Sequence, residues 1–313
     1  MITKLGRLLG AVLAGLGSCL LLPGAGTLPP LPATGLYAQT NLVAWCIVPF
    51  DAKKRGPEER ATMLAKLGLK RFAYDYRPEQ IPTFDAEIAA LKKHGIELTA
   101  WWFPTTLNDE AKNILTVLKR HGEHPQLWVM GGGGSTASAA EQSARVAAEA
   151  ERIGEIATAA KAIGSQVGLY NHGGWFGEPE NQIALIERLK QDGIDNVGII
   201  YNLHHGHDQL TRFPALLAKM KPYLLVLNLN GMTTGGDKLG LKILPLGQGA
   251  LDLELLTTIL VSGWRGPIGI LNHTDEDAEA RLLDNLAGLA WITGQLNGQP
   301  PGPKPVPVSW KQP

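Results

Sequence analysis

Two kinds of apolar pattern alternate along the chain from residue 41 to residue 292. Short runs of β-branched and apolar residues predict buried strands, and longer segments with apolar residues at helical spacing predict amphipathic helices. The predicted strands span residues 41–48, 70–76, 96–103, 126–130, 166–171, 197–202, 223–230 and 267–272. The predicted helices span residues 57–67, 85–94, 109–121, 139–163, 179–190, 210–220, 252–261 and 277–292.

Glycines such as Gly68, Gly95 and Gly122 follow the predicted helices, as is typical of helix C-termini. Eight strand–helix units with no element left over predict a (β/α)8 TIM barrel, because parallel strands with helical crossovers close at eight. The chain has 313 residues, of which 44% are apolar, and is long enough for one sizeable core. We therefore expect a single α/β domain over residues 39–296.

The first 38 residues are typical of an export signal. Lys4 and Arg7 precede an apolar stretch, residues 8–22, that is short and glycine-rich for a membrane span. Cleavage after Ala38 or after Ala25 would satisfy the preference for small residues. Residues 16–19, which end in Cys19, resemble a lipoprotein box, but the apolar residues that follow speak against lipid anchoring. We expect a secreted or periplasmic protein with no stable membrane insertion after signal removal.

The C-terminal residues 297–313 are rich in proline and have no apolar period, which predicts an extended and loosely attached tail. If processing removes Cys19, Cys46 is the one cysteine left, so no intramolecular disulfide can form. Because Cys46 lies in a predicted strand, we expect it to be a small core residue.

Charge narrows the class of partner. Without Lys4 and Arg7, residues 39–313 carry 27 basic and 29 acidic side chains. Proteins that bind phosphate backbones need a clear basic excess or patch, so this balance argues against a nucleic-acid partner.

Polar and aromatic residues follow the predicted strands at their carboxyl ends, where TIM barrels build their active sites. Asparagine both donates and accepts hydrogen bonds, and tryptophan faces pack against the C–H faces of sugars. This mixture predicts a small-molecule carbohydrate as the partner. The residues expected to bind it are Asp75, Trp102, Asn171, Asn202, His204, Asn228, Asn230, Gln248, Asn272 and His273.

Taken singly, these residues also fit structural roles. A strand-end asparagine is commonly a turn residue, but five of them on one face favour a shared site. Trp45 and Trp128 are expected to fill the barrel. Trp101 and Trp102 alternate along one strand, so only one of them can face the site.

The candidates for proton transfer are His172, His205, His207 and Glu178. Imidazole acts as acid or base near neutral pH, and Glu178 is the nearby carboxylate, although its place before a helix also fits a cap.

Imidazole also binds transition metals, and His172, His205 and His273 are the candidate ligands. Two alternatives stay open for the cofactor: a divalent metal held by these histidines, or none. An exported protein without an evident phosphate clamp favours unphosphorylated substrates, and Lys53, Arg55 and Arg77 are the candidates for such a clamp.

With this ring of strand ends assembled, residues 41–292 resemble the xylose-isomerase-like TIM barrels, a superfamily of sugar isomerases, epimerases and inosose-type dehydratases. The resemblance is carried by residues 67–74 (LGLKRFAY), 91–98 (LKKHGIEL), 169–172 (LYNH), 246–252 (LGQGALD) and 263–268 (GWRGPI).

That resemblance implies a divalent cation between Glu, Asp, His and Glu at the ends of strands five to eight, with two glutamates moving the proton. This chain departs from the pattern. It has Tyr170 or Asn171 near the first glutamate, Asn202 at the aspartate, Asn228 or Asn230 at the histidine, and Leu271 or Asn272 at the second glutamate. A hard Mg²⁺ or Mn²⁺ ion requires carboxylate oxygens, which these positions lack.

We therefore expect an enzyme that acts on a sugar or keto-sugar by proton transfer at carbon, through isomerisation, epimerisation or β-elimination. The alternative is a barrel that has lost its metal site and binds carbohydrate without turning it over. A third member of this fold class, an abasic-site nuclease, needs a multi-zinc cluster of His, Asp and Glu and positive charge, which this sequence does not supply.

Overall fold

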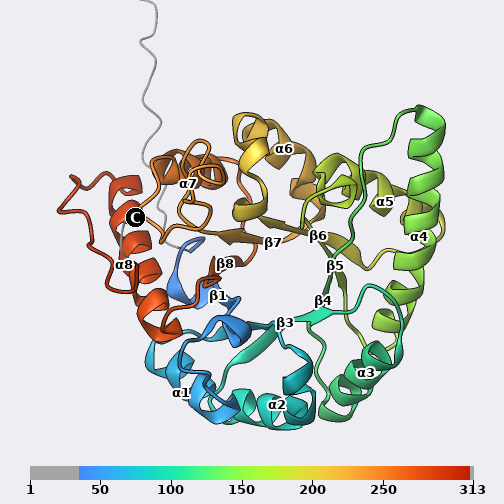
Figure 1. The fold of residues 1–313 in the computed structure, drawn as a ribbon, viewed down its shortest axis with the longest axis horizontal. Coiled ribbons are helices and arrows are strands. Elements are labelled where there is room, and N and C mark those ends of the chain that lie inside the picture. The colour runs from blue at the N-terminus through green and yellow to red at the C-terminus, as the bar shows by residue number, and fades with distance from the viewer. Residues whose placement is uncertain (1–34, 311–313) are drawn as a thin grey trace, which may run out of the picture.

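Eight parallel strands close into a barrel in the structure, a computed structural model that describes residues 35–310 (Figure 1). The strands are β1 (Leu42–Trp45), β2 (Arg71–Tyr74), β3 (Glu97–Phe103), β4 (Gln126–Val129), β5 (Val167–Tyr170), β6 (Val197–Asn202), β7 (Leu224–Leu229) and β8 (Ile268–Leu271). Each strand pairs with the next, and β1 pairs with β8. The prediction of a single-domain (β/α)8 TIM barrel is confirmed.

The predicted helices surround the barrel (Figure 1). They are α1 (Pro57–Lys66), α2 (Phe84–Lys93), α3 (Asp109–His121), α4 (Ala139–Lys161), α5 (Pro179–Gln191), α6 (Phe213–Met220), α7 (Asp252–Val261) and α8 (Ala278–Leu296). Side chains of Asn108, Ser138 and Asp277 accept backbone N–H groups at the starts of α3, α4 and α8. Helix α6 begins three residues later than predicted, because His207–Arg212 forms a 3-10 helix ahead of it.

Apolar side chains pack in two layers, which the alternation of each strand separates. The outer layer lies between strands and helices and includes Tyr74 and Trp101, whose ring centroids are 4.7 Å apart. The inner layer fills the barrel, where the centroids of Trp45 and Trp128 lie 4.6 Å apart. Trp102 packs against this inner layer. Trp45 and Trp128 fill the barrel as predicted, and of Trp101 and Trp102 only Trp102 faces the interior.

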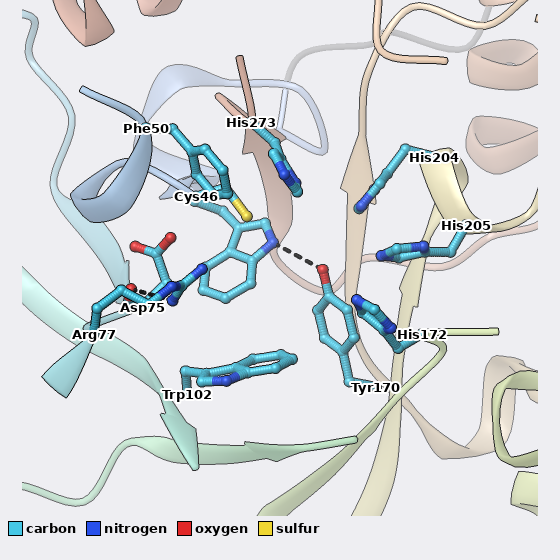
Figure 2. Close-up of a pocket in the computed structure, with 11 residues that line it drawn as sticks. Cys46, Phe50, Asp75, Arg77, Trp102, Tyr170, His172, His204, His205 and His273 are labelled. Carbon is cyan, nitrogen blue, oxygen red and sulfur yellow. Dashed lines mark hydrogen bonds between the residues drawn. The ribbon is translucent and has the colours of Figure 1, made fainter. Parts of the chain in front are cut away.

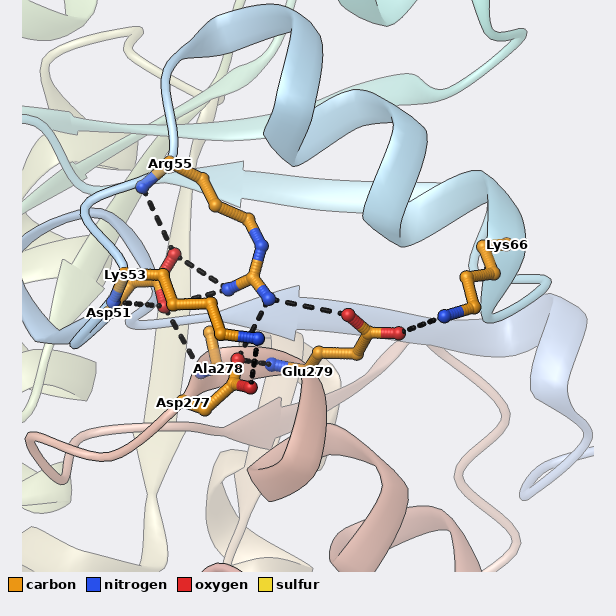
Figure 3. Close-up of polar contacts among 7 residues, drawn as sticks. All are labelled: Asp51, Lys53, Arg55, Lys66, Asp277, Ala278 and Glu279. Carbon is orange, nitrogen blue, oxygen red and sulfur yellow. Dashed lines mark hydrogen bonds and ion pairs between the residues drawn. The ribbon is translucent and has the colours of Figure 1, made fainter.

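Charged side chains join the first and last strand–helix units (Figure 3). Asp51 accepts hydrogen bonds from the Arg55 guanidinium at 2.8 and 2.9 Å and from the Ala278 N–H at 3.2 Å. Arg55 and Lys53 both pair with Asp277, at 2.8 and 2.7 Å. Lys53 and Arg55 are therefore held by carboxylates of the β1–α1 and β8–α8 connections, which closes the barrel at its seam.

The C-terminal tail is extended as predicted, but the expectation of loose attachment is wrong for residues 297–310. The Asp284 carboxylate on α8 accepts the N–H groups of Val308 and Ser309 at 2.9 and 2.8 Å. Gln248 donates to the Pro305 carbonyl at 2.8 Å. The apolar pattern gave no sign of these contacts, because polar side chains make them.

Residues 1–34, with most of the predicted signal peptide and Cys19, lie outside the described residues. Leu36 and Tyr37 are described and buried, and the Tyr37 hydroxyl donates to the Leu256 carbonyl at 2.7 Å. None of the helices within residues 35–310 is long and apolar enough to cross a membrane.

Candidate functional site

A recess of about 60 Å³ lies among the residues at the carboxyl ends of the strands (Figure 2). Six residues predicted for the site line it: Asp75, Trp102, His172, His204, His205 and His273. Five more complete the lining: Trp45, Cys46, Phe50, Arg77 and Tyr170. The strand ends therefore bring together much of the predicted site.

Four histidines form one wall of the recess. His172 follows β5, His204 and His205 belong to the 3-10 helix Leu203–His205 after β6, and His273 follows β8. The ring centroids of His204 and His205 are 3.7 Å apart, and those of His172 and His205 are 4.5 Å apart. Four imidazoles this close cannot all carry a proton without strong repulsion.

Burial lowers the pKa of all four imidazoles, to about 3 for His205 and about 4 for His273. The nearby Lys242 ammonium adds to this effect at each of them. The four rings are therefore neutral at pH 7, and each offers one N–H donor and one acceptor nitrogen. His204 is only 1% exposed, and neither of its ring nitrogens has a hydrogen-bond partner among the described residues.

Asp75 and Arg77, from the connection after β2, lie across the recess from His172, His204 and His205 (Figure 2). One carboxylate oxygen of Asp75, Oδ1, accepts the N–H groups of Ile47 and Val48 at 3.3 and 3.2 Å. The other, Oδ2, is buried and has no partner in residues 35–310. Burial raises the pKa of Asp75 to about 7, although the Arg77 guanidinium works in the opposite direction. This carboxyl group can therefore both take and release a proton near neutral pH.

The base of the recess is aromatic and apolar. The Trp45 indole N–H donates to the Tyr170 hydroxyl at 3.2 Å. Cys46 is buried, as predicted, and also lines the recess. Its backbone has φ of 56°, in the left-handed region that costs a residue with a side chain about 1 kcal/mol or more. This turn at the end of β1 directs the next two N–H groups, of Ile47 and Val48, toward Asp75.

Three of the predicted substrate-binding asparagines bond to one another instead of lining the recess. Asn202 donates its side-chain amide to Asn171 Oδ1 at 2.7 Å, and Asn228 donates to Asn202 Oδ1 at 2.6 Å. All three are at most 1% exposed. Gly269 leaves room for this chain of amides, because a Cβ there would lie 1.6 Å from Asn228 Oδ1. The chain links the ends of β5, β6 and β7, and substrate contact by these residues stays a prediction.

The remaining predicted binding residues also lie outside the recess lining. Asn230 donates to the Gly231 carbonyl at 2.8 Å, and Gln248 is engaged with the tail. Asn272 is fully buried, and neither of its amide atoms has a partner in the described part of the chain. Their contact with a substrate stays a prediction.

Two of the four predicted catalytic residues, Glu178 and His207, are not brought into the recess. Glu178 lies at the start of α5, where it pairs with Arg212 and accepts from Gln209 Nε2 at 3.1 Å. The Nε2 atom of His207 is 3.0 Å from the Lys242 carbonyl oxygen. Each side chain is engaged by a neighbouring loop or helix, and sequence periodicity does not encode the direction of a side chain within a loop.

Phe50 was not predicted for the site, Arg77 was named only as part of the alternative phosphate clamp, and Tyr170 only as a position where the related barrels hold a metal ligand. Their position in the sequence could have indicated a site role, because each lies at the end of a predicted strand or in the connection that follows it. Tyr170 is the last residue of β5. Its side chain belongs to the inner apolar layer of the barrel and also lines the recess. Phe50 packs against His273 with ring centroids 3.8 Å apart, a contact between the connections after β1 and β8 that no local pattern shows.

The donor set does not fit the divalent cation that the resemblance implies. Amide side chains stand at the ends of β5, β6 and β8, and three of the strand-end asparagines are hydrogen-bonded to one another. Within residues 35–310, no group of three or more His, Cys, Asp or Glu side chains has an arrangement that would hold a metal ion. The predicted ligands His172, His205 and His273 therefore do not form such a group.

Comparison with solved structures shows the same fold at low sequence identity. The IOLI protein with a binding zinc atom has a TM-score of 0.63 at 14% identity, over 81% of this chain and 98% of that chain. A 3-keto-D-glucoside 4-epimerase from E. coli has a TM-score of 0.58 at 13% identity, over the same shares. A xylose isomerase-like TIM barrel protein from Mycobacterium smegmatis in complex with magnesium has a TM-score of 0.51 at 15% identity, over 82% and 96%.

No family model and no curated protein matches the chain. At these identities the solved structures establish the shared fold, and the resemblance to xylose-isomerase-like TIM barrels is confirmed at that level.

Proposed function

We propose that the protein is an enzyme that acts on a sugar or keto-sugar by proton transfer at carbon. The observation that carries this proposal is the recess itself, where a buried carboxyl group of pKa about 7 faces a wall of neutral imidazoles. A base of that pKa is matched to proton transfer near neutral pH. The fold is shared with a structure named as a sugar epimerase, which supports the same reaction class.

In the proposed reaction, the free Oδ2 of Asp75 removes a proton from the carbon next to a carbonyl group. The C–H electron pair forms a carbon–carbon double bond, and the carbonyl electron pair moves onto oxygen to give an enediolate. A neutral N–H of His204 or His205 donates to that oxygen and stabilises its charge. Delivery of a proton to the opposite face of the same carbon by His172 or His273 gives an epimer. Return of the proton from Asp75 to the neighbouring carbon, with the hydroxyl proton moved to the other oxygen of the enediolate, gives an isomer. Departure of a β-hydroxyl as water, with the proton that Asp75 carries, gives a dehydrated product.

His172 and His273 flank this pair and supply a second acid or base. Both rings are neutral because burial lowers the pKa of each. Trp102 and Phe50 offer apolar faces on which a sugar ring can rest. No step is assigned to a metal ion, because the side chains at the strand ends do not match the donors such an ion prefers.

The experiment is solvent hydrogen exchange, followed by NMR in D₂O with a panel of keto-sugars. A proton-transfer enzyme incorporates deuterium at the reacting carbon even when the net conversion is small. Asp75→Asn, His172→Ala and His205→Ala should each abolish incorporation while circular dichroism shows an intact fold. Asp195→Asn and His121→Ala are the matched controls, because both residues form surface ion pairs and neither lines the recess. Unchanged incorporation in Asp75→Asn would exclude the carboxyl group as the base.

The second candidate is a barrel that binds carbohydrate without turnover. The aromatic lining of a small recess favours it, because such a surface holds a sugar without chemistry. Saturable binding of a keto-sugar, with no deuterium incorporation by the wild-type protein, would select this alternative.

We also propose export, with processing upstream of the barrel. Leu36 and Tyr37 pack into the core, so cleavage after Ala38 would remove buried contacts, and their burial favours cleavage after Ala25. N-terminal sequencing of the protein secreted by its native host tests this point.

A further inference from the structure

The recess is small for a complete sugar. Its volume is about 60 Å³, whereas ligand sites typically measure about 300–1,000 Å³. It admits the reacting edge of a ring and leaves the rest of the ligand outside. The structure must therefore offer a surface next to the recess where the remainder of a substrate rests.

A second hollow, of about 320 Å³, adjoins the recess between the connections after β2 and β3. The two concavities share two lining residues, Arg77 and Trp102. Pro104 and Thr105, on the connection from β3 to α3, line the far side of the hollow. A ligand that extends beyond the recess on the side of Trp102 and Arg77 therefore lies next to this hollow.

The side chains of the hollow suit a sugar ring. Trp102 is partly exposed and offers an aromatic face, on which the C–H groups of a ring stack. Arg77 donates through Nη1 to the carbonyls of Asp75 and Tyr76 at 3.0 and 2.8 Å. No carboxylate in residues 35–310 forms an ion pair with Arg77, and both of its hydrogen bonds use Nη1, so the N–H groups of Nε and Nη2 can serve hydroxyl oxygens.

We infer that this hollow is the subsite for a second sugar ring, so that the substrate is a disaccharide or a similar glycoside with its reacting ring edge in the recess. The inference rests on the proposed function for the chemistry in the recess, but the binding of the second ring does not require that chemistry. Stacking and hydrogen bonds to one ring should tighten binding by about tenfold, which corresponds to about 1.4 kcal/mol.

Another hollow of the molecule provides the control. It lies between the connections after β4 and β5, measures about 400 Å³ and includes Thr136. It has no lining residue in common with the recess. Thr105 and Thr136 thus allow the same substitution in two hollows, one continuous with the recess and one separate from it.

The experiment is a calorimetric titration with maltose, cellobiose and sucrose, each compared with glucose. At least one disaccharide should bind the wild-type protein about tenfold more tightly than glucose. Thr105→Trp fills the hollow, so it should remove this difference while glucose binding stays unchanged. Thr136→Trp should leave both affinities as in the wild type. Thr105→Arg is a second variant at the same exposed position, with the same expected loss.

Three results would overturn the inference: equal affinities for glucose and every disaccharide, no binding of any disaccharide, or equal effects of the two tryptophan variants. Deuterium exchange separates this test from that of the proposed function. Disaccharide binding that is tighter than glucose binding, without deuterium exchange, would support the subsite and contradict the proposed reaction. Exchange on keto-monosaccharides with no disaccharide preference means that the reaction stands and the subsite fails.

Discussion

Two buried carboxyl groups near the same end of the barrel differ in how their oxygens are used. Asp75 and Asp252 are each 2% exposed, and burial raises the pKa of each to about 7. Asp252 Oδ1 accepts the Met232 N–H at 2.7 Å, and its Oδ2 accepts the N–H groups of Gly247 and Gly249 at 2.7 and 3.1 Å. Asp75 Oδ2 has no partner in the described residues.

This difference in hydrogen bonding distinguishes a carboxyl group with a structural role from one that is available for catalysis. Asp252 fixes the two ends of the long β7–α7 connection, which approach closely enough that a Cβ on Gly249 would lie 2.2 Å from the Met232 nitrogen. A carboxyl group with every oxygen engaged stabilises a loop and cannot reach a substrate. An unpartnered oxygen on a residue that lines a recess costs stability, because a buried acceptor is left unmatched, and that cost is typical of an active site. Burial and a shifted pKa alone would not tell the two apart.

The largest expected effect comes from Asp75→Asn. The amide cannot accept a proton from carbon, so the exchange rate should fall by about 10²–10⁴-fold, the usual contribution of a general base. The free energy of unfolding should change by less than about 1 kcal/mol, because Asn can still accept the two N–H groups at Oδ1. NMR exchange rates and urea unfolding measure the two quantities. A large loss of stability with little change in rate per folded molecule would reverse the assignment.

Asp252→Asn should show the opposite pattern. The amide NH₂ replaces one acceptor oxygen and leaves at least one buried N–H without a partner, which costs on the order of 2–3 kcal/mol. The exchange rate per folded molecule should stay within about twofold of the wild type. Urea unfolding monitored by tryptophan fluorescence gives the stability, and the exchange assay gives the rate. A rate loss comparable to that of Asp75→Asn would place Asp252 in the chemistry.

The architecture could be predicted from the sequence, because the apolar spacing of a strand or a helix is visible within a short segment. Eight strand–helix units then predict a closed barrel. It also placed Asp75, Trp102 and the histidines His172, His205 and His273 at the carboxyl ends of strands, where the structure gathers them. These successes share a cause. A residue at the end of a parallel strand has its position fixed by the fold before any side-chain detail matters.

The orientation of side chains in loops could not be predicted from the sequence. Asn171 and Asn202 stand at strand ends as expected, but their amides satisfy each other across neighbouring strands. The direction of Glu178 depends on Arg212, which lies 34 residues further along the chain. Such pairings are tertiary contacts, and no periodicity or motif in a single sequence predicts them. The free oxygen of Asp75 is likewise a property of the packed structure.

The pH dependence of the exchange rate gives an effect of about tenfold per pH unit. Asp75 must be deprotonated to act as the base, and burial raises its pKa to about 7, so the rate should rise with pH up to about 7 and then level off. Titration of His205 and His273 should not change the exchange rate above pH 5, because burial lowers their pKa values to about 3 and about 4. A rate that is flat between pH 5 and 8 in a folded protein would contradict this assignment.

The smallest expected effect tests a third engaged carboxylate, Asp284, which holds the tail. Both of its oxygens accept N–H groups, from Val308 at 2.9 Å and Ser309 at 2.8 Å, as the oxygens of Asp252 do for the β7–α7 connection. The tail is a surface segment rather than an internal loop, so Asp284→Asn should lower the free energy of unfolding by less than about 1 kcal/mol. Hydrogen exchange at Val308 and Ser309 should nevertheless become about tenfold faster, because the amide keeps only one acceptor. Mass spectrometry of peptides from the tail measures this exchange, with Asp195→Asn as the control that leaves it unchanged, because Asp195 pairs with Lys161 and not with the tail. Exchange in the tail that is already fast in the wild type would contradict this role of Asp284.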